Sequence, residues 1–309
     1  MSFNRLAVYA HRGWASSKIF NALAASGAPT RVLYRPGSDV SSVPSHVEKV
    51  KVALDDQDSV RQSLQDIDIL ISLVGQSGVK LQYPFIEAIP HTNVKLFVPS
   101  DLAFRCNEQG LRVPVNKEKY KVEKAAFAAG IPMTIVLPGL FAESALNVPL
   151  LGVDLAKNRI VFSGDGEHQR LNICSRKYIA ASYASIFAQT PISELQGRVI
   201  GLSEIQPTGS EIAKALEARH GSPPQIFRHT LEQVDYHIQK TLDEGAPLTM
   251  VWYGRRVWGA GGYEAGIGND IWEVKGYKKK TLDELLNGGM EPYREFPEKI
   301  LELMDKTIY

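Results

Sequence analysis

The chain has 309 residues, with 35 lysines and arginines against 34 aspartates and glutamates, and therefore a formal charge of +1. This length is enough for one large or two modest domains with a buried core, and the hydrophobic fraction of 44% argues against disorder. The near-zero charge leaves no basic face to neutralise phosphates, so we expect no nucleic-acid partner. The sequence contains neither an apolar run of membrane-spanning length nor a signal-like start, which predicts a soluble, cytoplasmic protein with no membrane partner.

The cysteines and histidines are few and scattered. Cys106 and Cys174 form no C-x-x-C pair, so we expect free thiols in a reducing compartment. The seven histidines form no H-E-x-x-H or His-x-His cluster, so we expect no metal site. A G-x-S-x-G elbow is also missing, which disfavours a Ser-His-Asp hydrolase.

Short apolar runs alternate with segments of helical periodicity over the first 140 residues. The predicted strands are Leu6–Tyr9, Arg31–Tyr34, Val50–Ala53, Ile67–Val74, Lys95–Val98 and Met133–Leu137. The predicted helices between them are Lys18–Ala25, Ser59–Leu64, Val79–Ile89 and Lys117–Ala129. This alternation predicts a Rossmann-type, doubly wound parallel sheet, which we expect to form a dinucleotide-binding domain over residues 1–145.

The regular alternation weakens after residue 146. Helices are predicted over Arg176–Ala188 and Ser210–His220, and Arg198–Leu202 predicts a strand that returns to the sheet, within a return element near 173–205. We expect residues 146–309 to form a smaller α/β substrate-binding domain. The segment Gly254–Gly268 holds six glycines with aromatic residues between them, which predicts a mobile lid or pocket wall.

The first predicted strand leads into Ala10–Ser16, at the sheet edge where a pyrophosphate would meet the start of the first helix. This segment resembles the G-x-x-G-x-x-G turn of the NmrA-like and isoflavone-reductase-like branch of the atypical short-chain dehydrogenases. In that register Ala10, Gly13 and Ser16 occupy the three glycine positions. A Cβ at the first or third position is tolerated where the local φ is negative and is destabilising where it is positive. Trp14 either shields the phosphate position or packs against a neighbouring loop.

Further segments resemble the same family in the same order over most of residues 5–235. They are Leu33–Arg35, Asp68–Ser72, Leu96–Asp101, Gly130–Thr134, Pro138–Phe141 and Gly209–Gly221. The resemblance implies NADP(H) as the cofactor. The cofactor-binding residues that it implies are Ala10, Arg12, Gly13, Trp14, Arg35, Val74, Gly75, Pro99, Ser100 and Lys119.

Arg35 is the residue that indicates NADP(H) rather than NAD(H). An acid at the end of the second strand suits the ribose hydroxyls of NAD, whereas an arginine accommodates the 2′-phosphate of NADP. The planar guanidinium pairs with phosphate oxygens in two parallel hydrogen bonds. Arg12 is a second candidate for the same phosphate. The alternative for Arg35 is a surface arginine before a Pro-Gly turn.

The segment Tyr120–Lys124 matches the Tyr-x-x-x-Lys pair of short-chain dehydrogenases by letter. In the resembled family, however, the active lysine stands eleven residues before the glycine of G-I-P, and here that position is Lys119. Val115 takes the place of a partner tyrosine, so the resemblance implies that Lys119 acts alone as acid or base. Ser100 and Asp101 are further polar candidates, with turn or helix capping as their alternative role.

The resemblance implies an NADPH-dependent reductase of a small apolar or phenolic metabolite, such as those of secondary metabolism. Hydride would pass from the nicotinamide to an activated double bond, with Lys119 donating the proton. Two alternatives stay open: a non-catalytic, NmrA-type regulator that senses dinucleotide and acts on a protein partner, and a non-redox isomerase, dehydratase or cyclase. A homodimer is compatible with the sequence. The substrate pocket is expected in segments 104–114, 141–149 and 254–270.

Overall fold

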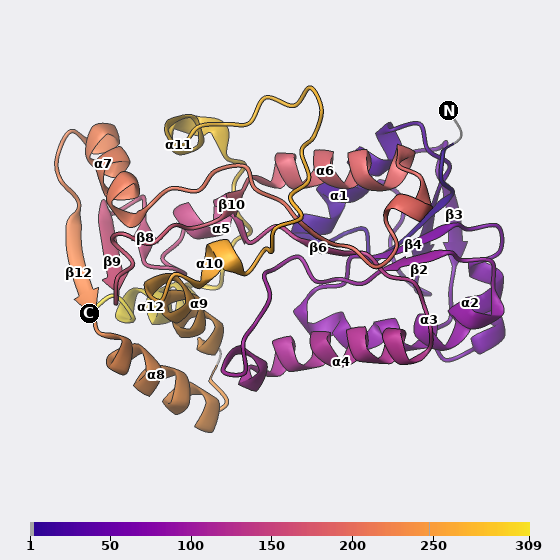
Figure 1. Cartoon of the computed structure of the whole chain (residues 1–309), viewed down its shortest axis with the longest axis horizontal. Helices are drawn as coiled ribbons and strands as arrows, with labels where there is room; N and C mark the ends of the chain where they lie inside the picture. Colours follow the sequence, from indigo (N-terminus) through magenta and orange to yellow (C-terminus); the bar gives the residue numbers. More distant parts are fainter. Residues whose placement is uncertain (1–2, 247) are drawn as a thin grey trace.

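The computed structural model describes residues 3–246 and 248–309. Its central sheet has five parallel strands in the order β3-β2-β1-β4-β5 (Figure 1). The strands are β1 (Leu6–Tyr9), β2 (Thr30–Tyr34), β3 (Glu48–Lys51), β4 (Ile69–Ser72) and β5 (Leu96–Val98). Beyond β5, a parallel bridge between Phe97 and Met133 leads to β6 (Ile135–Leu137), which pairs in parallel with β11 (Val199–Gly201). This order confirms the predicted Rossmann-type parallel sheet.

Helices cover both faces of the sheet. On one face lie α1 (Trp14–Ala25) and α6 (Arg176–Gln189), and on the other lie α2 (Gln57–Ser63), α3 (Tyr83–Ala88) and α4 (Pro114–Ala128) (Figure 1). Successive residues of β1 therefore enter two different cores: Leu6 and Val8 pack with α1 and α6, whereas Ala7 and Tyr9 pack with α2, α3 and α4. Burial on both faces explains why these strands are apolar without alternation.

The predicted helix over Val79–Ile89 is divided in the structure. A 3₁₀ turn, η1 (Gln76–Gln82), precedes α3, and a second short turn, η2 (Ile89–His91), follows it. Pro84 lies in the first turn of α3 and Pro90 lies in the first turn of η2. Proline has no N–H to donate, so it is tolerated at the start of a helical turn but interrupts a continuous helix.

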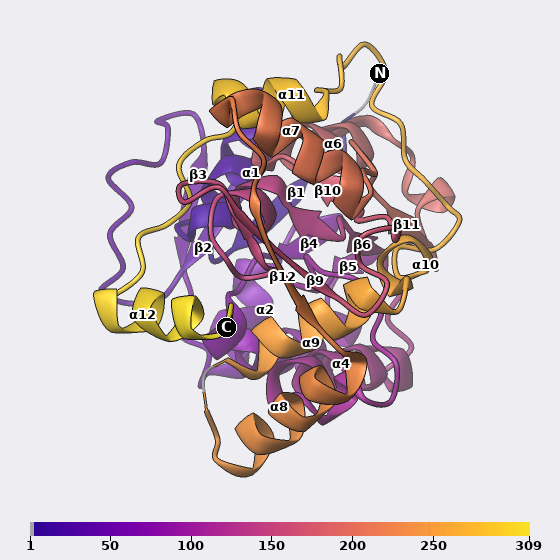
Figure 2. The same cartoon turned by 90° about the vertical axis from the view of Figure 1, so that its left-hand side faces the viewer.

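The rest of the chain surrounds a second apolar core. Two small sheets contribute. One pairs β10 (Ile173–Cys174) with β7 (Leu140–Phe141), and the other has the order β12 (Gln225–His229), β9 (Arg159–Ser163) and β8 (Val153–Asp154). The remaining helices are α5 (Ala142–Leu146), α7 (Gly209–His220), α8 (Leu231–Asp243), α9 (Thr249–Gly259), α10 (Gly262–Ala265), α11 (Leu282–Glu284) and α12 (Glu298–Lys306), and Figure 2 shows α7 to α12 from the side of this core. The short turns are η3 (Gly110–Arg112), η4 (Ile192–Glu194) and η5 (Leu285–Gly289). This core includes Phe104 and Ala142 from the first half of the chain, and the division at residues 145/146 stays a prediction.

The expectation of a mobile lid over Gly254–Gly268 is wrong. This segment contains most of α9 and all of α10, and Trp258 is completely buried. The glycines permit close packing: a Cβ on Gly254 would lie 2.7 Å from Leu151 Cδ2, and one on Gly259 would lie 2.1 Å from the carbonyl oxygen of Ser163. Glycine density here reflects close packing of other segments against this backbone rather than freedom of the chain.

Across the two described ranges, none of the helices has the length and apolar character needed to cross a bilayer.

Asp68 forms a charged cluster at the start of β4. Its carboxylate accepts hydrogen bonds from Arg5 Nε at 2.9 Å and from Lys95 Nζ at 2.9 Å. These bonds, led by that of Arg5, hold the pKa of the Asp68 carboxyl well below its ordinary value. The stabilisation is therefore complete at neutral pH and is lost as the pH falls below the carboxyl's unfolded-state pKa of about 4 and then through its lower native-state pKa.

We expect Asp68→Asn to lower the free energy of unfolding at pH 7 by about 1–2 kcal/mol, because hydrogen bonds to a charged group are lost. The difference from the wild type should shrink toward pH 3. Urea denaturation at several pH values measures both effects. Asp66→Asn is the matched control, since the Asp66 side chain is 80% exposed and lies 3.4 Å from the same arginine. Equal destabilisation by the two substitutions would contradict the assignment.

Candidate active site

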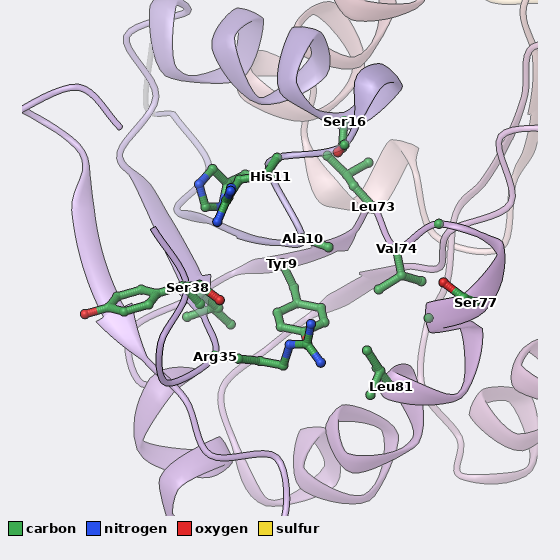
Figure 3. A pocket seen from close by; sticks show the side chains of 16 residues that line it. Tyr9, Ala10, His11, Ser16, Arg35, Ser38, Leu73, Val74, Ser77 and Leu81 are labelled. Carbon is green, nitrogen blue, oxygen red and sulfur yellow. The ribbon is translucent and has the colours of Figure 1, made fainter. Parts of the chain in front are cut away.

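A cavity of about 510 Å³ opens beyond the carboxyl ends of β1, β2 and β4 (Figure 3). Six of the residues predicted to bind a cofactor line it: Ala10, Arg12, Gly13, Arg35, Val74 and Gly75. A second hollow of about 620 Å³ shares Arg12 and Arg35 with the first and continues toward Asp55. The structure therefore brings together the glycine turn, the basic end of β2 and the end of β4, as parallel strands with a common edge require.

The conformation of the turn between β1 and α1 shows how much backbone strain results from Ala10 and Ser16 at the first and third glycine positions. Ala10 has φ +66°, in the left-handed region that favours glycine, so its Cβ is unfavourable here. Gly13 has φ −65°, but a Cβ on it would lie 2.8 Å from Ser16 Oγ. Ser16 lies within α1, where a Cβ causes no backbone strain. The first glycine position is therefore the strained one.

We expect Ala10→Gly to raise the free energy of unfolding by about 0.5–1 kcal/mol, because relief of the left-handed strain exceeds the extra entropy of glycine in the unfolded chain. Urea denaturation measures the change. Ala22→Gly, in the middle of α1, is the control and should lower the stability by about 1 kcal/mol. A loss of stability in Ala10→Gly would show that this turn carries no strain.

The start of α1 is open to an anion. No side chain caps it, and its first turn contains no acidic residue. The first amides of a helix lack partners within the helix, and together with the helix dipole they attract negative charge. Neither Arg12 nor Arg35 forms an ion pair among the residues that the structure describes. Two unpaired guanidinium groups and an uncapped helix thus face one cavity, which is the arrangement that a phosphorylated ligand needs.

Pro99 and Ser100 are both buried and do not line this cavity. Ser100 Oγ donates a hydrogen bond to the carbonyl oxygen of Val74 at 2.7 Å, and its N–H donates to Gln82 Oε1 at 2.9 Å. Ser100 therefore holds the backbone just after β4 in place without itself lining the cavity.

Trp14 also lies outside the cavity lining. Its ring contacts Phe141 and Tyr293 edge-on, with centroids 5.3 and 4.7 Å away. Its Nε1–H donates to the carbonyl oxygen of Pro292 at 3.1 Å, and the Arg176 guanidinium lies 4.9 Å above the ring. Of the two interpretations of Trp14, this geometry agrees with packing against a neighbouring segment.

Lys119 projects from α4 into a separate pocket of about 240 Å³. Its Nζ donates to the backbone carbonyl of Asp101 at 2.6 Å and lies 3.6 Å from Asp101 Oδ1. Arg105 and Glu123 form a bidentate ion pair in the same pocket, at 2.5 and 3.1 Å. The Lys119 ammonium group is therefore held in a fixed position in this pocket, beside Asp101 in the segment that follows β5.

The Tyr-x-x-x-Lys match lies partly outside the small pocket: Tyr120 is among the residues that line the pocket of Lys119, whereas Lys124 is not. Tyr120 is 44% exposed, Lys124 is exposed, and the Lys124 ammonium lies 5.4 Å from the Tyr120 ring centre. The geometry therefore agrees with Lys119, rather than Lys124, as the lysine of interest.

Several polar residues of the two pockets were not predicted as ligands. His11, Ser38 and Ser77 line the larger cavity, and Arg105 and Glu123 line the smaller one. Their positions in the segments that follow β1, β2, β4 and β5, or on α4, were the available signal. The ion pair between Arg105 and Glu123, which joins the segment after β5 to α4, was not visible in the sequence.

Comparison with known proteins places this chain in a family. The sequence profile of the NmrA-like family matches residues 4–282. Isoflavone reductase homolog IRL of Zea mays is 26% identical over 265 residues, covering 80% of this chain and 84% of that protein. Phenylcoumaran benzylic ether reductase 1 of Arabidopsis thaliana is 32% identical over 171 residues, covering 50% of this chain and 55% of that protein.

Two solved structures share the fold. The binary complex of leucoanthocyanidin reductase with NADPH from Vitis vinifera has a TM-score of 0.75 at 17% identity, covering 92% of this chain and 98% of that chain. A structure of isoflavone reductase has a TM-score of 0.73 at 20% identity, covering 93% and 99%. The match over nearly the whole sequence shows that the chain belongs to the NmrA-like family.

Proposed function

We propose that this protein is an NADPH-dependent reductase of a small apolar or phenolic metabolite, with Lys119 as the proton donor. The observation that carries the proposal is the cavity at the turn after β1, where an uncapped helix and two unpaired arginines meet. The relatives add support: one is named as a homolog of isoflavone reductase, another is a phenylcoumaran benzylic ether reductase, and one structural neighbour is a complex with NADPH.

The residues of the cavity fit a dinucleotide phosphate. The α1 amides would receive the pyrophosphate, and Gly13, which has no Cβ, would let the backbone approach it closely. Arg35, with Arg12 beside it, would bind the 2′-phosphate at the end of β2. Val74 and Gly75 form the wall on the β4 side. When bound, NADPH supplies the hydride.

Lys119 would supply the proton. Its ammonium group has three hydrogens, and one of them is directed to the Asp101 carbonyl. That bond orients Nζ and leaves other N–H groups for a substrate oxygen or carbon. Lys119 would release its proton to the substrate and recover one from solvent, as a general acid does. Cys106, Asn116 and Phe104 complete the pocket in which this transfer would occur.

The test is binding followed by turnover. Addition of NADPH should quench tryptophan fluorescence, and a panel of enones and phenolic ethers should include compounds that consume the bound NADPH. Absence of binding at high micromolar NADPH would contradict the proposal.

The strained left-handed Ala10 favours a second candidate, a dinucleotide-sensing regulator with a protein partner, because such a protein needs binding but no turnover. Binding of NADPH without consumption across the panel would support it. Conversion of a substrate without any change in NADPH would instead support an isomerase, dehydratase or cyclase.

A further inference from the structure

His11 lines the large cavity between Ala10 and Arg12 and has no part in the function proposed above. The residue is only 4% exposed. The ring contacts Phe20 of α1 edge-on, with centroids 5.3 Å apart, which fixes its orientation. Nε2 is enclosed and forms no hydrogen bond within the described part of the chain. A buried polar atom without a partner is uncommon and calls for an explanation.

The charges around His11 come from two elements. Arg12 follows it in the turn, and Asp39 faces it from the loop after β2. Phe20, the contact from α1, carries no charge. Burial first, and then Arg12, lower the pKa of His11, whereas Asp39 raises it. These surroundings therefore favour the neutral ring at neutral pH when no ligand phosphate lies beside it.

His11 lies on the side of the cavity formed by the loop after β2, which carries Ser38 and Asp39. Arg35 and Ser38 line the same cavity, and Figure 3 shows His11 and Ser38 on one side of it. A ligand phosphate held by Arg35 and Arg12 at that end would bring two negative charges close to the imidazole. A nearby dianion favours the protonated form of histidine, and an imidazolium donates hydrogen bonds from both nitrogens.

We propose that His11 is a proton-linked ligand of the 2′-phosphate, taking up one proton from solvent when the phosphorylated dinucleotide binds. This inference rests on the proposed use of NADP(H). His11 would thereby make the preference for NADP over NAD depend on pH. His11 has one pKa beside the bound phosphate and a lower pKa without it, and the preference for NADP rises as the pH falls from the first value to the second. The rise is up to about tenfold for each pH unit between the two values.

Isothermal titration calorimetry of NADP⁺ and NAD⁺ in two buffers of different ionisation enthalpy tests the proposal, because it counts protons. At pH 7 the wild type should take up a fraction of a proton per NADP⁺ and none per NAD⁺. His11→Gln keeps a hydrogen-bonding side chain but cannot be protonated. This variant should show no uptake, or a small release, because the 2′-phosphate itself has a pKa near about 6 and loses protons beside arginine.

Equal proton counts in the wild type and His11→Gln would overturn the inference and leave the cofactor assignment intact. Absence of heat with NADP⁺ would overturn the proposed cofactor and this inference together. Asp39→Asn gives a second test that keeps His11 in place. Removal of that carboxylate should move the pH profile of proton uptake to lower pH, and an unchanged profile would also contradict the role of His11.

Discussion

Replacement of Lys119 by alanine is expected to lower kcat of the proposed reduction by about 10²–10⁴-fold, the contribution of a positioned general acid. The affinity for NADPH should change much less, because Lys119 lies in the smaller pocket and not among the residues lining the phosphate cavity. NADPH consumption under saturating substrate measures the first effect, and tryptophan fluorescence measures the second. Lys119→Arg should remain slow, since a guanidinium retains its proton at neutral pH.

Lys124→Ala is the matched control for Lys119. Lys124 is on the same helix, is exposed, and belongs to the Tyr-x-x-x-Lys match. Its loss should leave kcat within a factor of about two, since surface substitutions away from special features have small effects. Full activity in Lys119→Ala together with loss of activity in Lys124→Ala would assign the proton transfer to the Tyr120–Lys124 pair instead.

Replacement of Arg35 by alanine is expected to weaken NADPH binding by about 10–100-fold, because hydrogen bonds between charged groups contribute about 1.5–3 kcal/mol. NADH lacks the 2′-phosphate, so its dissociation constant should be almost unchanged. Fluorescence titration with both dinucleotides measures the ratio. Arg61→Ala on α2 removes an arginine that does not line the cavity and should leave the ratio as it is. An Arg35→Ala variant that keeps its preference for NADPH would refute the assignment.

Much of the parallel sheet could be predicted because its strands are buried on both faces. Continuous apolar runs such as Ile69–Ser72 stand out between amphipathic helices, and this pattern is local in sequence. The segment Gly254–Gly268 could not be predicted in the same way. Its glycines are required by contacts with Leu151 and Ser163, about a hundred residues away, and sequence alone gives no sign of those contacts.

The same distinction applies to the candidate site. Gly13 and Arg35 follow strand ends, so their convergence follows from the topology of a parallel sheet. Trp14 could not be placed, because its partners Pro292 and Tyr293 lie near the other end of the chain. The burial of His11 likewise depends on the approach of Phe20 across the turn.

The central claim is that the cavity over Gly13 binds NADP(H), and a crystal structure of the protein grown with saturating NADP⁺ tests it most directly. We predict density for a dinucleotide with its pyrophosphate at the start of α1 and its 2′-phosphate at Arg35. An empty cavity under these conditions, or density for the dinucleotide at another place on the surface, would contradict the account.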